Sequence, residues 1–287
     1  MSRAGAFLAV AVAYVAALAV AAFVVVALAG QPTWLTLLVA DVAATAVVFA
    51  FSVGRNNSSV YDPYWSIAPM VIVVWLAAHA AAPLAREVIV LGLVLAWGAR
   101  LTWNWARGWQ GLAHEDWRYV AIRARTGRAY WLVSWVGIHL MPTLWVYLGS
   151  LSLIPAIATG TRPLGVVDAI AFAVTAGALV IETLADQQLR TFRLSGAPAG
   201  TILATGLWRW SRHPNYLGEI GFWWGLFLFA IAADRAWLAI AGPLAINLLF
   251  VTISIPLLDR RSIERRPAYA DHIARVPALV PRPWRRR

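Results

Sequence analysis

The chain has 287 residues, of which 61% are hydrophobic and only 13% are charged, and its mean hydropathy is +0.68. Soluble globular domains carry about 45–50% apolar and about 25% charged residues, so this composition excludes that class. Cysteine is absent, which excludes disulfides, cysteine-ligated metal centres and thiol catalysis. All 24 basic residues are arginine and the net charge is +11, so lysine Schiff-base chemistry is excluded too.

Long apolar runs dominate the chain and predict membrane spans. About 20 helical residues cross a hydrocarbon core of about 30 Å, and each run is long enough to do so. The runs cover 5–29, 33–53, 65–83, 86–106, 130–157, 165–185, 216–233 and 236–258. The first run lacks a clear signal-peptide cleavage site, so we expect it to stay in the membrane. The predicted class is all-α, a polytopic integral membrane helix bundle of about seven or eight spans in a single domain.

Arginine is unevenly distributed between the two sets of loops. The segments 107–128, 190–212 and 259–287 are rich in arginine, whereas the opposite loops hold Arg86, Arg162 and Arg235. The positive-inside rule then predicts that both termini are cytoplasmic and that the loop around 158–164 is outside. Because these charges lie between spans, we expect membrane lipid and no nucleic acid as a partner. The arginine-only, alanine-rich usage suits a GC-rich bacterial genome and hence a bacterial inner membrane.

Polar residues inside the expected spans are candidates for function. An ionisable group in a span costs about 2.5–3.5 kcal/mol on insertion scales, so each needs a partner or a purpose. These residues are Asp41, Arg100, Asn104, Glu182, Asp186 and Glu219. All except Asp41 lie near the cytoplasmic ends of their spans. Asp41 is in the middle of its span, where a helix-packing hydrogen bond is the simplest expectation.

The stretch 205–224, TGLWRWSRHPNYLGEIGFWW, carries the most information. Ser211 is expected to cap a helix whose first turn contains Pro214. Asn215 and Glu219 then share one face, and Arg212 and His213 lie at the positive helix end, where anions bind well. The alternative is a helix start at the interface, with the arginines reaching to the surface and an aromatic belt of Trp208, Trp210, Trp223 and Trp224.

The motif SRHPNYLGE and the C-terminal segment ERRPAYADHIARVPALVPRPW resemble the membrane steroid 5α-reductase superfamily, in particular its bacterial branch. The same Arg-His-Pro-x-Tyr-x-Gly signature occurs in sterol-ring reductases and in isoprenylcysteine and phospholipid methyltransferases. The resemblance covers roughly 55–287 and leaves the helices of 1–54 outside it.

This resemblance implies NADPH held from the cytoplasmic side and an activity like that of 3-oxo-5α-steroid 4-dehydrogenases, with a role in steroid or lipid metabolism. The substrate would be an apolar enone whose C=C bond accepts hydride, and the arginines would suit the 2′-phosphate of NADPH. The implied cofactor-binding residues are Arg100, Asn104, Arg107, Glu182, Asp186, Arg212, His213, Asn215, Tyr216, Glu219, Asp259, Arg260, Glu264, Arg265 and Tyr269.

The resemblance also implies an acidic residue at an apolar helix start, and by spacing this is Asp62 in VYDPYWSIAP. A protonated Asp62 would hydrogen-bond the ketone oxygen, where charge develops. The tyrosine that assists it in the reductases falls at Trp97, so Tyr61 or Tyr64 would supply the phenol. An equally good interpretation of Asp62 is a helix N-cap before Pro63.

Two other function classes are compatible with the sequence. One is a membrane methyltransferase of the isoprenylcysteine or phospholipid type that uses S-adenosylmethionine, and the other is a lipid-binding protein without catalysis. A metal is not expected, because His213 and His272 have no other ligand at metal-binding spacing.

Overall fold

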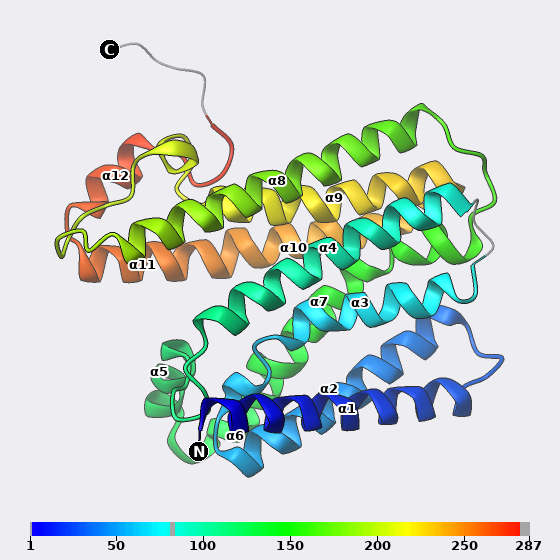
Figure 1. Cartoon of the computed structure of the whole chain (residues 1–287), viewed down its shortest axis with the longest axis horizontal. Helices are drawn as coiled ribbons and strands as arrows, with labels where there is room; N and C mark the ends of the chain where they lie inside the picture. The colour runs from blue at the N-terminus through cyan, green and yellow to red at the C-terminus, as the bar shows by residue number, and fades with distance from the viewer. Residues whose placement is uncertain (1, 81–83, 282–287) are drawn as a thin grey trace.

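The computed structural model describes residues 2–80 and 84–281, and these ranges contain α-helices and no β-strand. The long helices lie side by side along one axis (Figure 1). Their bounds are α1 Arg3–Ala27, α2 Thr33–Arg55, α3 Tyr64–Ala77, α4 Leu84–Gly108, α5 Trp117–Thr126, α6 Tyr130–Val133, α7 Met141–Ser150, α8 Val166–Leu194, α9 Pro214–Asp234, α10 Ala241–Leu249, α11 Ile255–Arg265 and α12 Tyr269–Arg275. Turns of π-helix over Ser134–Leu140 and Phe250–Ser254 join α6 to α7 and α10 to α11 into longer helical stretches.

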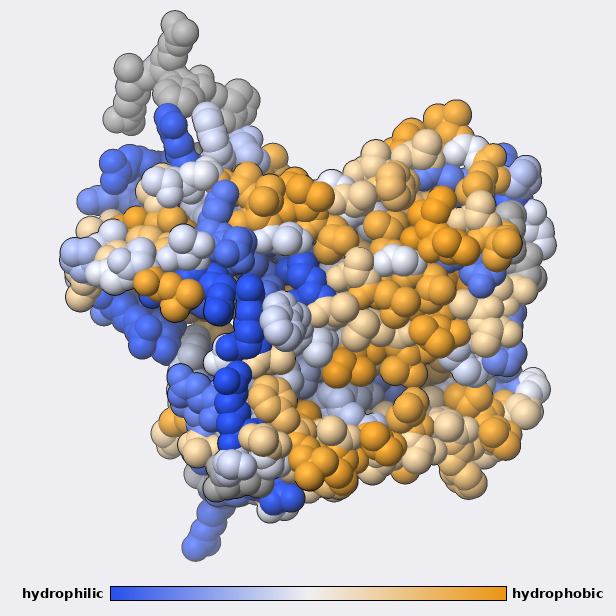
Figure 2. Space-filling view, viewed as in Figure 1, coloured by the Kyte–Doolittle hydropathy of each residue, from blue (hydrophilic) through white to orange (hydrophobic). Residues whose placement is uncertain are grey.

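Seven helical stretches within the described residues are long and apolar enough to cross a membrane. They are Arg3–Ala27, Thr33–Arg55, Ser58–Ala77, Trp117–Thr159, Val166–Leu194, Pro214–Asp234 and Trp237–Arg265. The remaining expected span is α4, a helix of 25 residues that lies among the others in the bundle (Figure 1). The chain is therefore an integral membrane protein of the polytopic all-α class, as its composition predicts. Apolar side chains cover most of the flank that Figure 2 shows.

The bundle has two ends of different character. The N-terminus, α5, α11 and α12 lie at the same end, which is the left end of Figure 1 and carries most of the polar surface in Figure 2. The arginines at this end include Arg3, Arg55, Arg107, Arg118, Arg123, Arg125, Arg128, Arg190, Arg193, Arg209, Arg212, Arg260, Arg261, Arg265, Arg266 and Arg275. Arg86, Arg162 and Arg235 lie at the opposite end. The arginine-rich segments are thus grouped at one end, as their positions in the sequence predict.

The loops expected at this end contain more helix than the sequence predicts. Segment 107–128 includes α5, whose N-cap residue Asp116 accepts a hydrogen bond from the Arg118 amide at 2.8 Å. In addition, α8 continues to Leu194 and α11 to Arg265, beyond the apolar runs that predicted them. Both helices extend past the apolar stretch as polar, arginine-bearing turns, because helix propensity does not require burial.

A close contact between α8 and α9 depends on Gly218. A Cβ atom at Gly218 would lie 2.6 Å from Glu182 Cβ and 2.7 Å from the Ala178 carbonyl oxygen, so a larger residue would push the helices apart. Small residues allow such close approach between membrane helices. The contact brings the polar face of α9 against the acidic face of α8.

The core beside this contact is aromatic. Trp97 from α4 is fully buried and stacks on Phe222 of α9, with ring centroids 4.9 Å apart and an interplanar angle of 9°. Trp223 meets Trp97 edge-on at 5.3 Å. These large rings fix the distance between α4 and α9.

A buried ion pair joins α4 to α8 at the end opposite the arginine-rich one. Arg86 is fully buried, and its Nε and Nη2 atoms lie 2.7 and 2.9 Å from the two carboxylate oxygens of Asp168. The same guanidinium donates to the carbonyl oxygens of Arg162 and Pro163. Asp168 also accepts from the Gly165 amide at the start of α8. The donors of Arg86 therefore pair with fixed acceptors in the first turns of α8 and in the preceding loop.

We predict that Asp168→Asn lowers the free energy of unfolding by about 3–5 kcal/mol, because it leaves a buried guanidinium without its counter-charge. Thermal unfolding of the detergent-solubilised protein measures this change. The matched control is Glu264→Gln, which breaks the exposed Arg260–Glu264 pair and should leave the melting temperature nearly unchanged. Equal losses for the two variants would contradict the prediction.

Candidate functional site

The SRHPNY motif forms the start of α9. The helix begins at Pro214 with His213 as its N-cap residue, so the expectation that Ser211 caps it is wrong. The Ser211 hydroxyl instead donates to the Ala278 carbonyl oxygen at 3.0 Å and accepts from the His213 amide at 3.3 Å. Proline remains at the first helical position, where its missing N–H costs nothing. Ser211 therefore anchors the segment before α9 to the C-terminal segment and does not cap the first turn of α9.

The C-terminal segment is attached to this motif through Arg212 and Asp259. Arg212 Nη2 lies 2.8 Å from one carboxylate oxygen of Asp259, and His213 Nε2 lies 3.0 Å from the other. Arg212 Nη1 also donates to the Val276 carbonyl oxygen at 2.5 Å. The backbone amides of Arg212 and His213 donate to the carbonyl oxygens of Pro277 and Ala278. These contacts, which we name the C-terminal clamp, join α9, α11 and the segment after α12.

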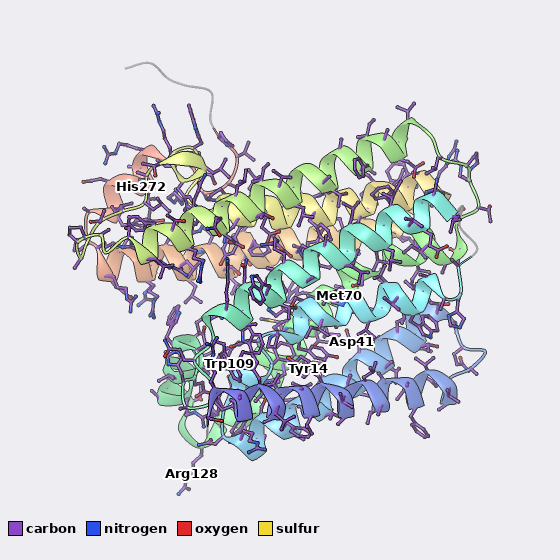
Figure 3. The ribbon with its side chains drawn as sticks, in the orientation of Figure 1. Tyr14, Asp41, Met70, Trp109, Arg128 and His272 are labelled. Carbon is purple, nitrogen blue, oxygen red and sulfur yellow. The ribbon has the colours of Figure 1, made fainter. Side chains whose placement is uncertain are left out.

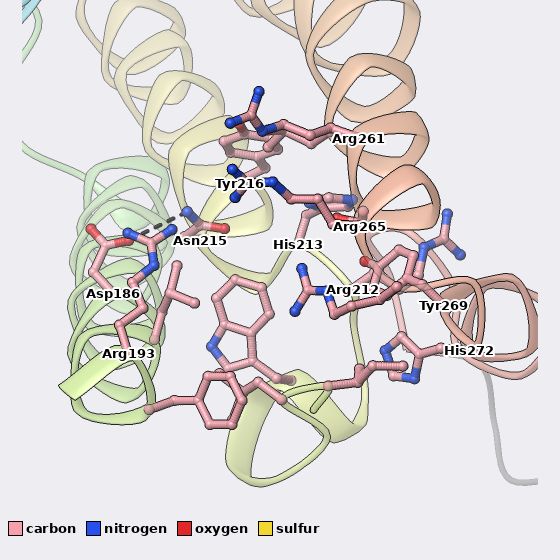
Figure 4. A pocket seen from close by; sticks show the side chains of 18 of the residues that line it. Asp186, Arg193, Arg212, His213, Asn215, Tyr216, Arg261, Arg265, Tyr269 and His272 are labelled. Carbon is pink, nitrogen blue, oxygen red and sulfur yellow. Dashed lines mark hydrogen bonds between the residues drawn. The ribbon is translucent and has the colours of Figure 1, made fainter. Parts of the chain in front are cut away.

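A cavity of about 650 Å³ lies beside the C-terminal clamp, between α8, α9, α11 and α12 (Figure 4). Its polar lining contains Asp116, Asp186, Arg193, Arg212, His213, Asn215, Tyr216, Arg261, Ser262, Arg265, Arg266, Tyr269 and His272. Its aromatic and aliphatic lining includes Trp117, Phe192, Trp208 and Leu258. We call it the arginine cavity.

The arginine cavity carries an excess of positive charge. Within the described residues, Arg193, Arg261, Arg265 and Arg266 have no carboxylate within 4.0 Å. Arg261 lies over the ring of Trp117 at 3.3 Å, and Arg266 donates to the Thr201 carbonyl oxygen at 3.2 Å. Four guanidinium groups without a carboxylate at ion-pair distance, against the two carboxylates of Asp116 and Asp186 in the lining, favour an anionic ligand.

Two titratable groups of α12 at the edge of the cavity are uncharged at neutral pH. Burial raises the pKa of the Tyr269 phenol to about 12. Burial, together with the nearby Arg212, holds the pKa of His272 below its ordinary value. Tyr269 and His272 therefore add no positive charge to that of the arginines at neutral pH.

A polar row leads from the cavity into the bundle. Arg100 of α4 lies 2.7 Å from Asp186 and 2.5 Å from Glu182, which are one turn apart on α8. Asp186 also accepts hydrogen bonds from the side-chain amides of Asn104 and Asn215, at 2.9 and 3.3 Å. The face that Asn215 and Glu219 share on α9 thus meets the acidic face of α8.

Glu219 ends this row at its deepest point. Its two carboxylate oxygens accept hydrogen bonds from the indole N–H groups of Trp97 and Trp223, at 2.9 and 2.8 Å. Glu182 is a neighbouring carboxyl group. Trp97 therefore serves as a hydrogen-bond donor to Glu219.

The other residues predicted to bind the cofactor occupy varied positions. Asp186, Arg212, His213, Asn215, Tyr216, Arg265 and Tyr269 line the arginine cavity. Arg100, Asn104, Glu182 and Glu219 form the polar row behind it, where Arg107 donates to Asn104 at 2.5 Å. Asp259 belongs to the C-terminal clamp. Arg260 and Glu264 pair with each other on the surface, with 80% and 60% of their side chains exposed.

The three predicted catalytic residues point in different directions. Asp62 accepts a hydrogen bond from the Tyr119 hydroxyl of α5 at 2.8 Å. The Tyr61 hydroxyl lies 2.7 Å from Thr143 Oγ1, and the Tyr64 hydroxyl donates to Asp41 at 2.7 Å. The N-cap interpretation of Asp62 is wrong, because Pro63 holds that position and no side chain caps α3.

Some cavity residues were not among the sequence candidates, notably Arg193, Arg261 and Arg266. The signal for Arg261 and Arg266 was present in RRSIERR, where Arg261 and Arg265 are four residues apart and so share one helix face. Tyr119, the partner of Asp62, had no such signal, because only the fold brings α5 against the start of α3.

The fold and site define an integral membrane helix bundle with an arginine-lined cavity at one end. Residues 48–276 match the family described as "Protein of unknown function (DUF1295)", and the chain belongs to this family. It is also similar to the uncharacterized protein C594.04c of Schizosaccharomyces pombe, with 30% identity over 268 residues that cover 82% of this chain and 76% of that protein. No solved structure matches the chain.

We predict that Arg212→Met loosens the C-terminal clamp, because Asp259 loses its guanidinium partner and the carbonyls of 273–276 lose a donor. Amide hydrogen exchange over 273–278 should become at least tenfold faster, which corresponds to a loss of about 1.4 kcal/mol of local stability. Arg265→Met is the control, since Arg265 lines the same cavity without contributing to the clamp. Unchanged exchange in the Arg212 variant would show that the backbone contacts suffice.

Proposed function

We propose that the protein is a membrane reductase that uses NADPH to reduce the C=C bond of an apolar enone, such as a 3-oxo-Δ4 steroid. The observation that carries this proposal is the arginine cavity, which is located directly at the motif that resembles the steroid 5α-reductase superfamily. The resemblance supports the reaction class, and the charge of the cavity supports the cofactor class.

The residues of the arginine cavity fit a phosphorylated dinucleotide. Arg193, Arg261, Arg265 and Arg266 offer guanidinium groups suited to phosphate oxygens, and Trp117 and Trp208 offer flat surfaces for a ring. Asp186 supplies a carboxylate that a sugar hydroxyl can donate to. The cavity volume of about 650 Å³ lies within the usual range for cofactor pockets. When bound, NADPH supplies hydride, and the protein contributes binding and orientation.

Asp62 and Tyr119 are the protein groups that we assign to the ketone side of the reaction. They are hydrogen-bonded to each other and adjoin Asp116 and Trp117, which line the arginine cavity. A carboxyl group and a phenol placed together can donate to an oxygen on which negative charge develops. Tyr61 and Tyr64 have partners inside the bundle, and so Tyr119 replaces them in this proposal.

The proposed orientation places the arginine-rich end in the cytoplasm, in accordance with the positive-inside rule. NADPH would then reach its cavity from the cytoplasmic side, and an apolar substrate would arrive through the bilayer.

The charge of the cavity also bears on the methyltransferase alternative. S-adenosylmethionine carries a sulfonium cation and an ammonium group, whereas NADPH carries several phosphate charges. Four arginines without a carboxylate partner, in the part of the chain that the structure describes, therefore favour the dinucleotide.

We predict that the purified protein binds NADPH and that Arg265→Ala weakens binding by about tenfold, since one charge-assisted contact is worth about 1.5–3 kcal/mol. Titration of NADPH fluorescence in detergent measures the Kd. Arg260→Ala is the matched control, because it removes the same charge from the same helix at an exposed position outside the cavity. Binding of S-adenosylmethionine in place of NADPH would overturn the proposal in favour of the methyltransferase.

We also predict that Asp62→Asn lowers NADPH-dependent turnover of a steroid enone by at least about tenfold, equivalent to 1.4 kcal/mol. The Kd for NADPH should stay within about twofold, since Asp62 does not line the arginine cavity. NADPH oxidation followed by absorbance gives the rate. Arg260→Ala is again the control and should keep the rate of the parent protein. An Asp62→Asn variant with the parent rate would remove Asp62 from the reaction.

A further inference from the structure

A second cavity lies within the membrane-spanning part of the bundle, between α1, α2 and α3. Its volume is about 320 Å³. The lining is almost entirely apolar, as Leu18, Ala21 and Val71 illustrate, and its polar side chains are Tyr14, Asp41 and Tyr64. We call it the α1–α3 cavity. It shares no lining residue with the arginine cavity, and the two are therefore separate sites.

The α1–α3 cavity opens toward the outside of the bundle. Leu18 and Val71 line it and yet are 50% and 38% exposed, and Val26 at its far end is 74% exposed. Figure 3 shows Tyr14 and Asp41 in the region between α1 and α3, on the flank of the bundle. These exposed residues belong to predicted spans, so a ligand would reach the cavity from the bilayer rather than from water.

Asp41 is the one carboxyl group in this apolar lining. Only 6% of the residue is exposed. Its Oδ1 atom accepts a hydrogen bond of 2.7 Å from the Tyr64 hydroxyl, which also approaches the Asp41 carbonyl oxygen at 3.2 Å. Its Oδ2 atom is buried and has no hydrogen-bond partner among the residues that the structure describes. A helix-packing role explains Oδ1 and leaves Oδ2 unexplained.

The neighbouring hydroxyl groups are already engaged. Tyr14 donates to the Val60 carbonyl oxygen at 2.9 Å, and its ring meets the ring of Tyr64 edge-on at 5.9 Å. The Thr45 and Tyr61 hydroxyl oxygens lie 2.8 and 2.7 Å from Thr143 Oγ1. Burying a polar atom without a hydrogen-bond partner costs free energy. Because the neighbouring hydroxyl groups are engaged, a partner for Oδ2 has to come from outside the protein.

We propose that the α1–α3 cavity binds an apolar lipid that carries one hydroxyl group, with the hydroxyl at Asp41 Oδ2. A hydroxyl group can donate to a carboxylate and accept from a protonated carboxyl group, so it satisfies Oδ2 in either state. A ketone could only accept, and a hydrocarbon could do neither. The small residues Ala17, Ala21, Ala40 and Ala44 make room for the chain or ring of the lipid.

This site is separate from the proposed reductase function. Asp41 and the whole of α1 lie outside residues 48–276, the part of the chain that matches the family. The site needs no NADPH, and binding at Asp41 can be measured on protein that has no reductase activity. Failure of either proposal therefore leaves the other intact.

The test uses photolabelling of the full-length protein in lipid nanodiscs. The probes are a dodecanol that carries a diazirine and the matched diazirine alkane without the hydroxyl group. Mass spectrometry of the peptides of α1, α2 and α3 gives the labelling yield as a function of probe concentration. We expect the alcohol to label these peptides with at least about tenfold higher apparent affinity than the alkane, because only the alcohol satisfies the buried oxygen.

Two variants separate the hydroxyl contact from the cavity itself. Asp41→Leu should reduce the affinity for the alcohol to that for the alkane, and Ala21→Phe should abolish labelling by both probes by filling the cavity. Ala19→Phe is the control for the second variant, since Ala19 lies on the exposed side of α1 and outside the cavity. If Asp41→Leu fails to fold, the proposal is still tested by the ratio of alcohol to alkane affinity in the parent protein and by the loss of label in Ala21→Phe.

Three results would overturn the proposal. The first is equal affinity of the two probes in the parent protein, which would mean that ordinary lipid chains fill the cavity. The second is an unchanged preference for the alcohol in a folded Asp41→Leu variant. The third is labelling by the alcohol that persists in Ala21→Phe.

Discussion

The charge balance around Arg100 is the constraint on which the polar half of the bundle depends. One guanidinium from α4 lies between Glu182 and Asp186 of α8, in a region where uncompensated charge is costly. Without Arg100, α8 would bring two carboxylates next to Glu219 with no cation among them. The ion pairs therefore join α4 to α8, while the contacts of Trp97 with Phe222 and Trp223 set the distance between α4 and α9.

From this constraint the geometry of the arginine cavity follows. Because Arg100 and Asn104 hold Asp186, its other oxygen is directed to Asn215 at the start of α9. The start of α9 is in turn attached to α11 through Asp259. In this wall of the cavity, the side-chain donors already form hydrogen bonds within the protein. Among the described residues, Arg193 and Arg265 form no ion pair, so their guanidinium groups are available to a ligand.

Much of this organisation could be predicted from the sequence, for identifiable physical reasons. Apolar runs of span length predicted the helices, and the i, i+4 spacing of Asn215 with Glu219 predicted that they share one face of α9. The cap at Ser211 was predicted wrongly because residue type alone does not distinguish a capping serine from one that bonds to Ala278, 67 positions away. The partners of Asp62 and Asp41, namely Tyr119 and Tyr64, also depend on helix packing that no local pattern encodes.

The segment around Asp62 makes hydrogen bonds to residues near both cavities. Asp62 reaches Tyr119 beside the lining of the arginine cavity, whereas Tyr64, two residues further on, reaches Asp41 in the lining of the α1–α3 cavity. Tyr61 and Tyr64 stack with ring centroids 5.2 Å apart, so this stretch of backbone is held firmly from both sides. A ligand that displaced the Tyr64 hydroxyl from Asp41 would have to disturb this stack. The two cavities share no lining residue, and residues 61–64 contact Tyr119 near one cavity and Asp41 in the lining of the other.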